Sequence, residues 1–132
     1  MVNIHDKAKY WLELAYYDLE TAEHMLKAKR YLYVGFLCHL VAEKSIKAYY
    51  WHIKKEQPPF SHNLLRLSEL STLDKVINPD FFDLFDILMP LNIQARYPDD
   101  KELLLKSLTN KIAENIISET KEFFLCVKKL IK

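Results

Sequence analysis

The stretch from Tyr31 to Lys55, YLYVGFLCHLVAEKSIKAYYWHIKK, decides the fold of this chain. Its apolar residues recur at spacings of three, four and seven, which is the pattern of an α-helix. The two apolar rows consist of Val34, Leu37, Val41 and Ala48, and of Phe36, Leu40 and Tyr50. A helix that is apolar on most of its sides must be surrounded by other helices, so we expect this segment at the centre of the protein.

Glycine is nearly absent from the chain, which has one glycine, Gly35, among 132 residues. That leaves no material for hairpin turns or phosphate-binding glycine loops, so the sequence predicts an all-α protein without a P-loop or a Rossmann motif. Hydrophobic residues make up 50% and charged residues 28% of the chain, an ordinary globular composition. A chain of this length can bury a core without disulfides or metals, and we expect one domain over residues 1–132.

The net charge is small, at +1, which predicts no strong general attraction to nucleic acid or to an anionic membrane. The longest run without Asp, Glu, Lys or Arg covers Tyr31 to Ala42, and its 12 residues are fewer than the roughly 20 that span a bilayer. The N-terminal residues are charged where a signal peptide would be apolar, and Cys38 and Cys126 stand alone. We therefore expect a cytoplasmic protein with two reduced core cysteines and no membrane contact.

The segments on both sides of the central one predict further helices. They run from Asn3 to Ala28, from an N-cap at Ser61, from Asp80 to Arg96 with a kink or break at Pro90, and from Thr109 to Leu130. The last of them should bury Ile112, Ile116, Thr120, Phe123, Val127 and Leu130. Together these segments predict an up-and-down helical bundle of four to five main helices with short extra helices.

Three local patterns, in their order and at their mutual distances, resemble the HEPN family. They are Ala15, Asp18, Leu19 and Ala22; Ala42, Glu43, Lys44, Lys47 and Ala48; and Ser61, His62, Asn63, Leu64 and Leu67, followed by Ala95, Arg96, Tyr97, Pro98 and Asp99. The resemblance covers nearly the whole chain. It implies a five-helix bundle that frequently forms homodimers and associates with nucleotides or RNA. Many such proteins act beside a minimal nucleotidyltransferase encoded as a separate chain, in a toxin–antitoxin-like context.

The sequence departs from the ribonuclease members of the wider superfamily, which carry an Arg and a His separated by four to six residues. The arginines here are Arg30, Arg66 and Arg96, and none of them is followed by a histidine at that distance. His62 is the last histidine of the chain. The resemblance therefore implies a protein without nuclease activity of its own.

The charged residues of the central segment allow two interpretations. Glu43 and Lys47 are four apart, in the order that favours a helical ion pair, so the pair could be structural and tie this helix to Asp18 or Arg96 on its neighbours. Alternatively, Lys44 and Lys47 share a face of the helix and bind one phosphate, while Glu43 holds one of the two lysines in place.

Three residues elsewhere in the chain are candidates for the same ligand. His62 either caps or tethers the third helix, or lines a cleft in which it contacts a base or a phosphate. Arg96 and Tyr97 either cover the end of the bundle, or offer a guanidinium for phosphate and a ring for stacking. His39 precedes Glu43 by four residues, but no third ligand is indicated, so we expect no metal site and no cofactor.

Our leading hypothesis is a homodimer that binds nucleotide or RNA phosphate, has no catalytic activity of its own and works beside a nucleotidyltransferase. Its ligand-binding residues would be Lys44, Lys47, His62, Arg96 and Tyr97, with Asp18 and Glu43 as structural partners. The tyrosines that favour a dimer surface are Tyr10, Tyr16, Tyr17, Tyr31, Tyr33, Tyr49 and Tyr50. Two alternatives remain: a ribonuclease toxin that uses His62 and Arg96, and a purely structural dimerisation module.

Overall fold

The computed structural model describes the backbone of residues 4–96 and 106–131 and the side chains of residues 6–92 and 106–131. Its helices are α1 (Ile4–Lys27), α2 (Tyr31–Lys54), α3 (Leu64–Leu70), the 3₁₀-helix η1 (Leu73–Lys75), α4 (Asp80–Arg96) and α6 (Asn110–Leu130). These two described ranges contain no β-strand. The prediction of an all-α helical bundle is therefore confirmed. The part of the expectation that concerns residues 97–105 lies outside the described residues.

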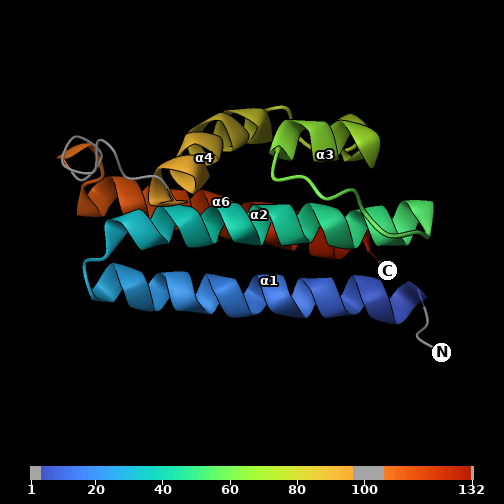
Figure 1. Cartoon of the computed structure of the whole chain (residues 1–132), viewed down its shortest axis with the longest axis horizontal. Coiled ribbons are helices and arrows are strands. Elements are labelled where there is room, and N and C mark those ends of the chain that lie inside the picture. The colour runs from blue at the N-terminus through green and yellow to red at the C-terminus, as the bar shows by residue number, and fades with distance from the viewer. Residues whose placement is uncertain (1–3, 97–105, 132) are drawn as a thin grey trace.

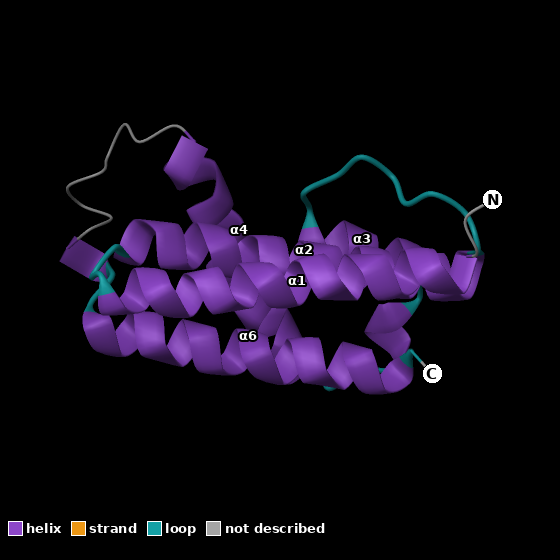
Figure 2. Cartoon of the chain, turned by 90° about the horizontal axis from the view of Figure 1, so that it is seen from below, coloured by secondary structure: helices purple, strands orange, loops and turns teal. Residues whose placement is uncertain are grey.

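The long helices α1 and α2 run antiparallel, side by side, and α6 lies along both of them (Figures 1 and 2). The shorter helices α3 and α4 pack on α2 from the other side (Figure 1). Thus α2 contacts α1, α3, α4 and α6, which explains why its sequence is apolar on most sides. Its buried residues include charged ones, Glu43 and Lys47, in the middle of the helix.

The connection between α1 and α2 is a tight reversal built by residues 28–30. Lys29 adopts the left-handed conformation, with φ of 61°. The backbone N–H of Arg30 donates to the carbonyl of Met25 at 2.8 Å, and that of Lys29 donates to the carbonyl of Leu26 at 3.0 Å. This pair of hydrogen bonds is the Schellman motif, which ends a helix and turns the chain. Because the turn is so short, α2 must return along α1.

Small residues let α2 approach its neighbours closely. Ala15 and Ala22 of α1 are fully buried in the core that this helix shares with α2. On the opposite side, Gly35 of α2 faces Leu91 of α4, and a Cβ at Gly35 would lie 2.7 Å from the Leu91 Cδ1 atom. The position of the one glycine of the chain is therefore set by helix packing and not by a turn.

Helix α4 runs through Pro90 as one continuous helix, so the alternative of two separate pieces is wrong. A proline inside a helix removes one backbone hydrogen bond and crowds the preceding turn, and the packing of α4 on α2 and α6 offsets that cost. Its phenylalanines form an aromatic cluster with α6. In this cluster the ring of Phe123 lies 5.2 Å, centre to centre, from both Phe81 and Phe85, in edge-to-face geometry.

Two details of the predicted helices are corrected by the structure. Asn63, not Ser61, caps α3, because its side-chain oxygen accepts the Arg66 backbone N–H at 3.0 Å, while the Ser61 hydroxyl accepts the N–H of Asn63. In α6, Ile112 and Leu130 are 42% and 36% exposed. The buried stripe of α6 is instead completed by Ala113, Ile117 and Phe124, one position over.

Candidate functional site

The carboxylate of Glu43 is the centre of a buried polar group on α2. Its Oε2 accepts a hydrogen bond from the Lys47 ammonium at 3.0 Å, and its Oε1 accepts one from the Nδ1 of His62 at 2.8 Å. The Glu43 side chain is 6% exposed and that of Lys47 is 10% exposed. A charge at this depth is tolerated because both of its oxygens have partners.

A second histidine, His39 of α2, fixes the chain that carries His62. The Nε2 of His39 lies 3.0 Å from the backbone carbonyl of His62, so His39 donates and the carbonyl accepts. The Nδ1 of His39 lies 3.7 Å from Oε1 of Glu43. We call His39, Glu43, Lys47 and His62 the Glu43 centre. Three of its four members, at intervals of four residues, lie on one row of α2.

The bond to Glu43 determines the tautomer of His62. A carboxylate only accepts, so the Nδ1 of His62 carries the proton, and in the neutral imidazole the Nε2 keeps a lone pair. The His62 side chain is 55% exposed although its Nδ1 is bound at the buried carboxylate. The centre thus holds an oriented imidazole at the protein surface.

Lys44 belongs to a separate ion pair. Its ammonium donates to Oδ2 of Asp18, on α1, at 2.6 Å, and the side chains are 22% and 12% exposed. The two lysines that share a face of α2 are therefore bound to different carboxylates, Lys44 to Asp18 and Lys47 to Glu43. Each ammonium has three N–H donors, so each retains donors for another acceptor.

Two tryptophans, which the sequence analysis did not single out, lie beside lysine side chains, one of them beside Lys47. The ammonium of Lys47 lies 5.8 Å from the ring centre of Trp11, and that of Lys7 lies 5.8 Å from the ring centre of Trp51. Both distances are within the range of cation–π attraction. The signal in the sequence was weak, because an aromatic residue at the border of an apolar stripe is ordinarily read as core.

The candidates near the end of α4 cannot be joined to this geometry by contacts. Arg96 is the last residue of α4, but the described side chains end at residue 92 before resuming at 106, so its guanidinium is outside them. Tyr97 lies outside the described residues altogether. Their convergence with Lys44, Lys47 and His62 stays a prediction.

The buried thiol of Cys38 and the buried phenol of Tyr50, both on α2, are not activated for reaction. Burial raises the pKa of the Cys38 thiol from 9.0 to about 12, which keeps it protonated at neutral pH. Burial also raises the pKa of Tyr50, and the Glu56 carboxylate, which accepts the Tyr50 hydroxyl at 3.0 Å, raises it further. Neither side chain is an activated nucleophile.

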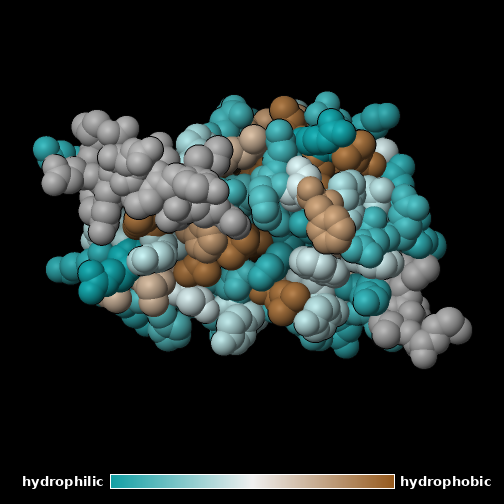
Figure 3. All heavy atoms as spheres, viewed as in Figure 1, coloured by the Kyte–Doolittle hydropathy of each residue, from teal (hydrophilic) through white to brown (hydrophobic). Residues whose placement is uncertain are grey.

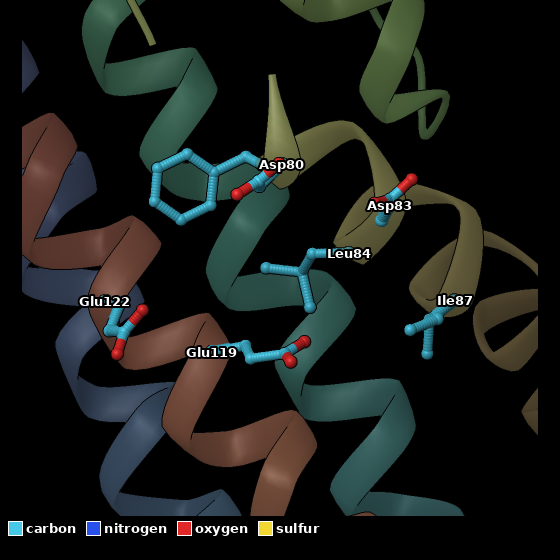
Figure 4. Close-up of a pocket in the computed structure, with 7 residues that line it drawn as sticks. Asp80, Asp83, Leu84, Ile87, Glu119 and Glu122 are labelled. Atoms are coloured by element: carbon cyan, nitrogen blue, oxygen red, sulfur yellow. The ribbon is translucent and has the colours of Figure 1, made fainter. Parts of the chain in front are cut away.

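A surface cleft of about 300 Å³ lies between the start of α4 and the middle of α6 (Figure 4). Leu84 points into the space between the two helices, and four carboxylates surround it, those of Asp80, Asp83, Glu119 and Glu122 (Figure 4). These acidic groups disfavour a phosphate ligand. No group of three or more possible metal ligands occurs within the described parts of the chain, this cleft included.

The face of the molecule in Figure 3 alternates between polar side chains and apolar ones, and apolar residues gather over the N-terminal half of α2. In this half of the helix Leu37 and Leu40 are half-buried. Among the helices that the structure describes, none combines enough length and apolarity to cross a bilayer.

The protein is an α-helical bundle whose central helix carries buried charged side chains, and each of these side chains is paired with a neighbouring one. The model of the HEPN domain matches residues 8–130, and the chain belongs to the HEPN family. Its fold is similar to the crystal structure of TT1696 from Thermus thermophilus, with 23% sequence identity and a TM-score of 0.79 over 93% of this chain and 97% of that chain. At this identity the likeness shows the fold alone. No curated protein matches the chain.

Proposed function

We propose that this HEPN protein binds nucleotide or RNA phosphate through Lys44, Lys47 and His62, with Arg96 and Tyr97 completing the site. The observation that carries the proposal is the Glu43 centre, in which a buried carboxylate holds one ammonium and one half-exposed imidazole in fixed positions. A preorganised donor loses little conformational entropy when an anion binds. Lys44 is held in the same way by Asp18.

The charges of the site explain why Arg96 is part of the proposal. Lys44 and Lys47 are each neutralised by one carboxylate, so the described part of the site has almost no net charge while His62 is neutral. A phosphate needs at least one further cation to offset the loss of its hydration. The guanidinium at the end of α4 would supply it, with two N–H groups for the phosphate oxygens.

The proposed partners are a second copy of the chain and a nucleotidyltransferase in the cytoplasm. Tyr10 and Tyr17, seven residues apart on α1, are 56% and 69% exposed, and Tyr33 of α2 is 52% exposed. Aromatic rings that are partly exposed in this way are enriched at interfaces between proteins. Tyr49 and Tyr50 are buried within the fold and are not available for the interface. The two free cysteines, Cys38 and Cys126, are consistent with a reducing compartment.

Calorimetric titration of ATP and of a short single-stranded RNA into the purified protein tests the binding site. Lys44→Gln and Arg96→Gln should each weaken binding about tenfold, because each removes one charged contact to phosphate. Lys121→Gln, which replaces an exposed lysine of α6, is the matched control and should bind like the wild type. Equal affinities in all four proteins would discard the site.

The hydrogen bond between Glu43 and His62 favours a second candidate, a ribonuclease that uses His62 and Arg96. A carboxylate that orients an imidazole and leaves Nε2 with a lone pair is the arrangement of a general base. Such a base would take the proton of a ribose 2′-hydroxyl while an arginine stabilises the phosphate. RNA cleavage by the wild type, lost in His62→Ala, would support this candidate, and an inert protein at high concentration would eliminate it.

A further inference from the structure

The loop between α2 and α3 carries the most exposed large apolar side chain among the described residues. Phe60 is 94% exposed, whereas the next most exposed aromatic residue, Tyr17, is 69% exposed. A phenylalanine so fully surrounded by water is unfavourable by itself, at about 25 cal/mol for each Å² of apolar surface. Its position therefore needs a reason.

Phe60 occupies the tip of a tight turn. The backbone N–H of Ser61 donates to the carbonyl of Pro59 at 3.0 Å, which closes a three-residue turn with Phe60 in the middle. Pro58, on the N-terminal side of the turn, is buried. Because the proline rings of residues 58 and 59 also fix their φ angles, the chain enters the turn in a defined direction.

The C-terminal side of the turn is anchored in the Glu43 centre. The carbonyl of His62 accepts from His39, and its ring donates to Glu43. The Ser61 hydroxyl accepts the backbone N–H of Asn63 at 3.1 Å. Phe60 is thus held between two anchored points, and its exposure is a property of the fixed loop.

The sequence that leads into this turn contains two lysines. Lys54 and Lys55 are exposed at the end of α2, a few residues before Phe60, and Lys7 reaches the ring of Trp51 in the same end of the helix. Glu56, the acidic residue of this stretch, accepts the Tyr50 hydroxyl and keeps its negative charge, so it offsets one of the two lysines. On the other side of Phe60 lies the half-exposed imidazole of His62. An exposed aromatic ring, held in a fixed turn two residues before an oriented histidine, is suited to a planar base that carries phosphate.

We propose that Phe60 is the stacking platform for a nucleobase of the ligand. This inference rests on the proposed function, because it assigns the base of the same ligand whose phosphate the cationic residues would hold. Stacking of a base on an aromatic side chain is tolerant of base identity, so the platform would accept a mononucleotide or single-stranded RNA.

The test compares base-bearing ligands with a ligand that has phosphates alone. Wild type, Phe60→Ala, Phe60→Leu and Phe60→Trp are titrated with ATP, with a short single-stranded RNA and with tripolyphosphate. Phe60→Ala and Phe60→Leu should bind ATP and RNA about tenfold more weakly and tripolyphosphate as the wild type does, while Phe60→Trp should keep the full affinity. Val76→Ala, which trims another exposed apolar side chain, should leave all affinities unchanged.

Three results would overturn the proposal. The first is wild-type affinity for ATP and RNA in Phe60→Ala. The second is an equal loss for tripolyphosphate, which would mean that Phe60 does not act on the base. The third is a change of oligomeric state in Phe60→Ala on sedimentation, with unchanged ligand binding, which would assign the ring to a protein contact. This test can be told apart from the test of the phosphate site. If Lys44→Gln and Arg96→Gln bind the ligands normally but Phe60→Ala does not, the proposed phosphate-binding residues are wrong and the stacking role of Phe60 is supported.

Discussion

The aromatic cluster of α4 and α6 and the Glu43 centre of α2 both lie where separate elements meet, but different forces hold them. In the aromatic cluster, Phe81 and Phe85 each contact Phe123 through apolar surface that has no unique partner. In the Glu43 centre, each carboxylate oxygen is bound by one particular neighbour. A deletion in the cluster leaves a cavity, whereas a deletion in the centre leaves a charge without a partner. The cluster is suited to stability and the centre to fixing the positions of polar groups.

The largest effect should come from the cluster. Phe123→Ala removes a ring that is fully buried against two others, and we expect a loss of about 3–5 kcal/mol in the free energy of unfolding. Urea denaturation measures this loss. Phe60→Ala deletes the same ring from a site that is 94% exposed, so it serves as the matched control and should change the stability by less than about 0.5 kcal/mol. A loss below about 2 kcal/mol for Phe123→Ala would mean that the cluster is loosely packed.

The second prediction tests whether the polar side chains of the Glu43 centre depend on one another for stability. Glu43→Ala leaves the buried ammonium of Lys47 and the Nδ1 of His62 without their acceptor, and should cost about 2–3 kcal/mol. Glu43→Gln keeps one acceptor oxygen and should cost less. The double variant Glu43→Leu with Lys47→Met removes both charges, so it should be more stable than Glu43→Ala in the same denaturation experiment. If Glu43→Ala and the double variant were equally unstable, shape and not charge would hold this part of α2.

The fold could be predicted from the sequence because its signals are repeated many times. The apolar rows of α1 and α2, the short link between them and the near absence of glycine all indicate the same bundle, and one misplaced position does not alter it. The errors occurred at single positions that depend on neighbours in space. Pro90 does not interrupt α4, and Asn63 caps α3, because packing and local hydrogen bonds decide those points.

The candidate site was harder to predict, because its geometry depends on residues far apart in the sequence. The spacing of four residues indicated contact between Glu43 and Lys47, since both lie on one helix. The sequence indicated Asp18 as a structural partner of α2 but not that Lys44 is the residue that binds it, and it did not indicate that His62 binds Glu43 or that His39 holds the backbone of His62. Each of these bonds depends on how the elements pack. The exposure of Phe60 likewise follows from a turn that no periodicity reveals.

A pH experiment extends the comparison to a thiol in the apolar part of α2. Burial raises the pKa of Cys38 to about 12, whereas the thiol of the unfolded chain ionises near 9.0. Above pH 9 the unfolded state therefore loses a proton that the folded state keeps, so the protein becomes less stable as the pH rises from about 9 to about 12, with no effect from this group well below pH 9. Between about pH 8 and about pH 10 the loss due to Cys38 should be about 1.4 kcal/mol.

Cys38→Ala isolates this contribution, because the variant should lose about 1.4 kcal/mol less than the wild type over the same change of pH. Cys126→Ala is the control, since Cys126 is only half-buried and its ionisation should matter less. Identical pH profiles for wild type and Cys38→Ala would show that the Cys38 thiol is reached by water in the folded protein.

The smallest effect concerns Gly35, where packing opposes helix propensity. Alanine is favoured over glycine in the interior of a helix by about 1 kcal/mol, so Gly35→Ala would stabilise an isolated α2. In the folded protein the added methyl group would lie 2.7 Å from Cδ1 and 3.1 Å from Cβ of Leu91, and such overpacking costs about 1–3 kcal/mol. We expect the clash to prevail by about 1 kcal/mol, measured by thermal unfolding. The double variant Gly35→Ala with Leu91→Ala keeps the contact with Cβ of residue 91 but loses the closer one with Cδ1, so the two substitutions should be less destabilising together than the sum of their separate effects. Strict additivity would place the cost of Gly35→Ala in α2 itself and not in its contact with α4.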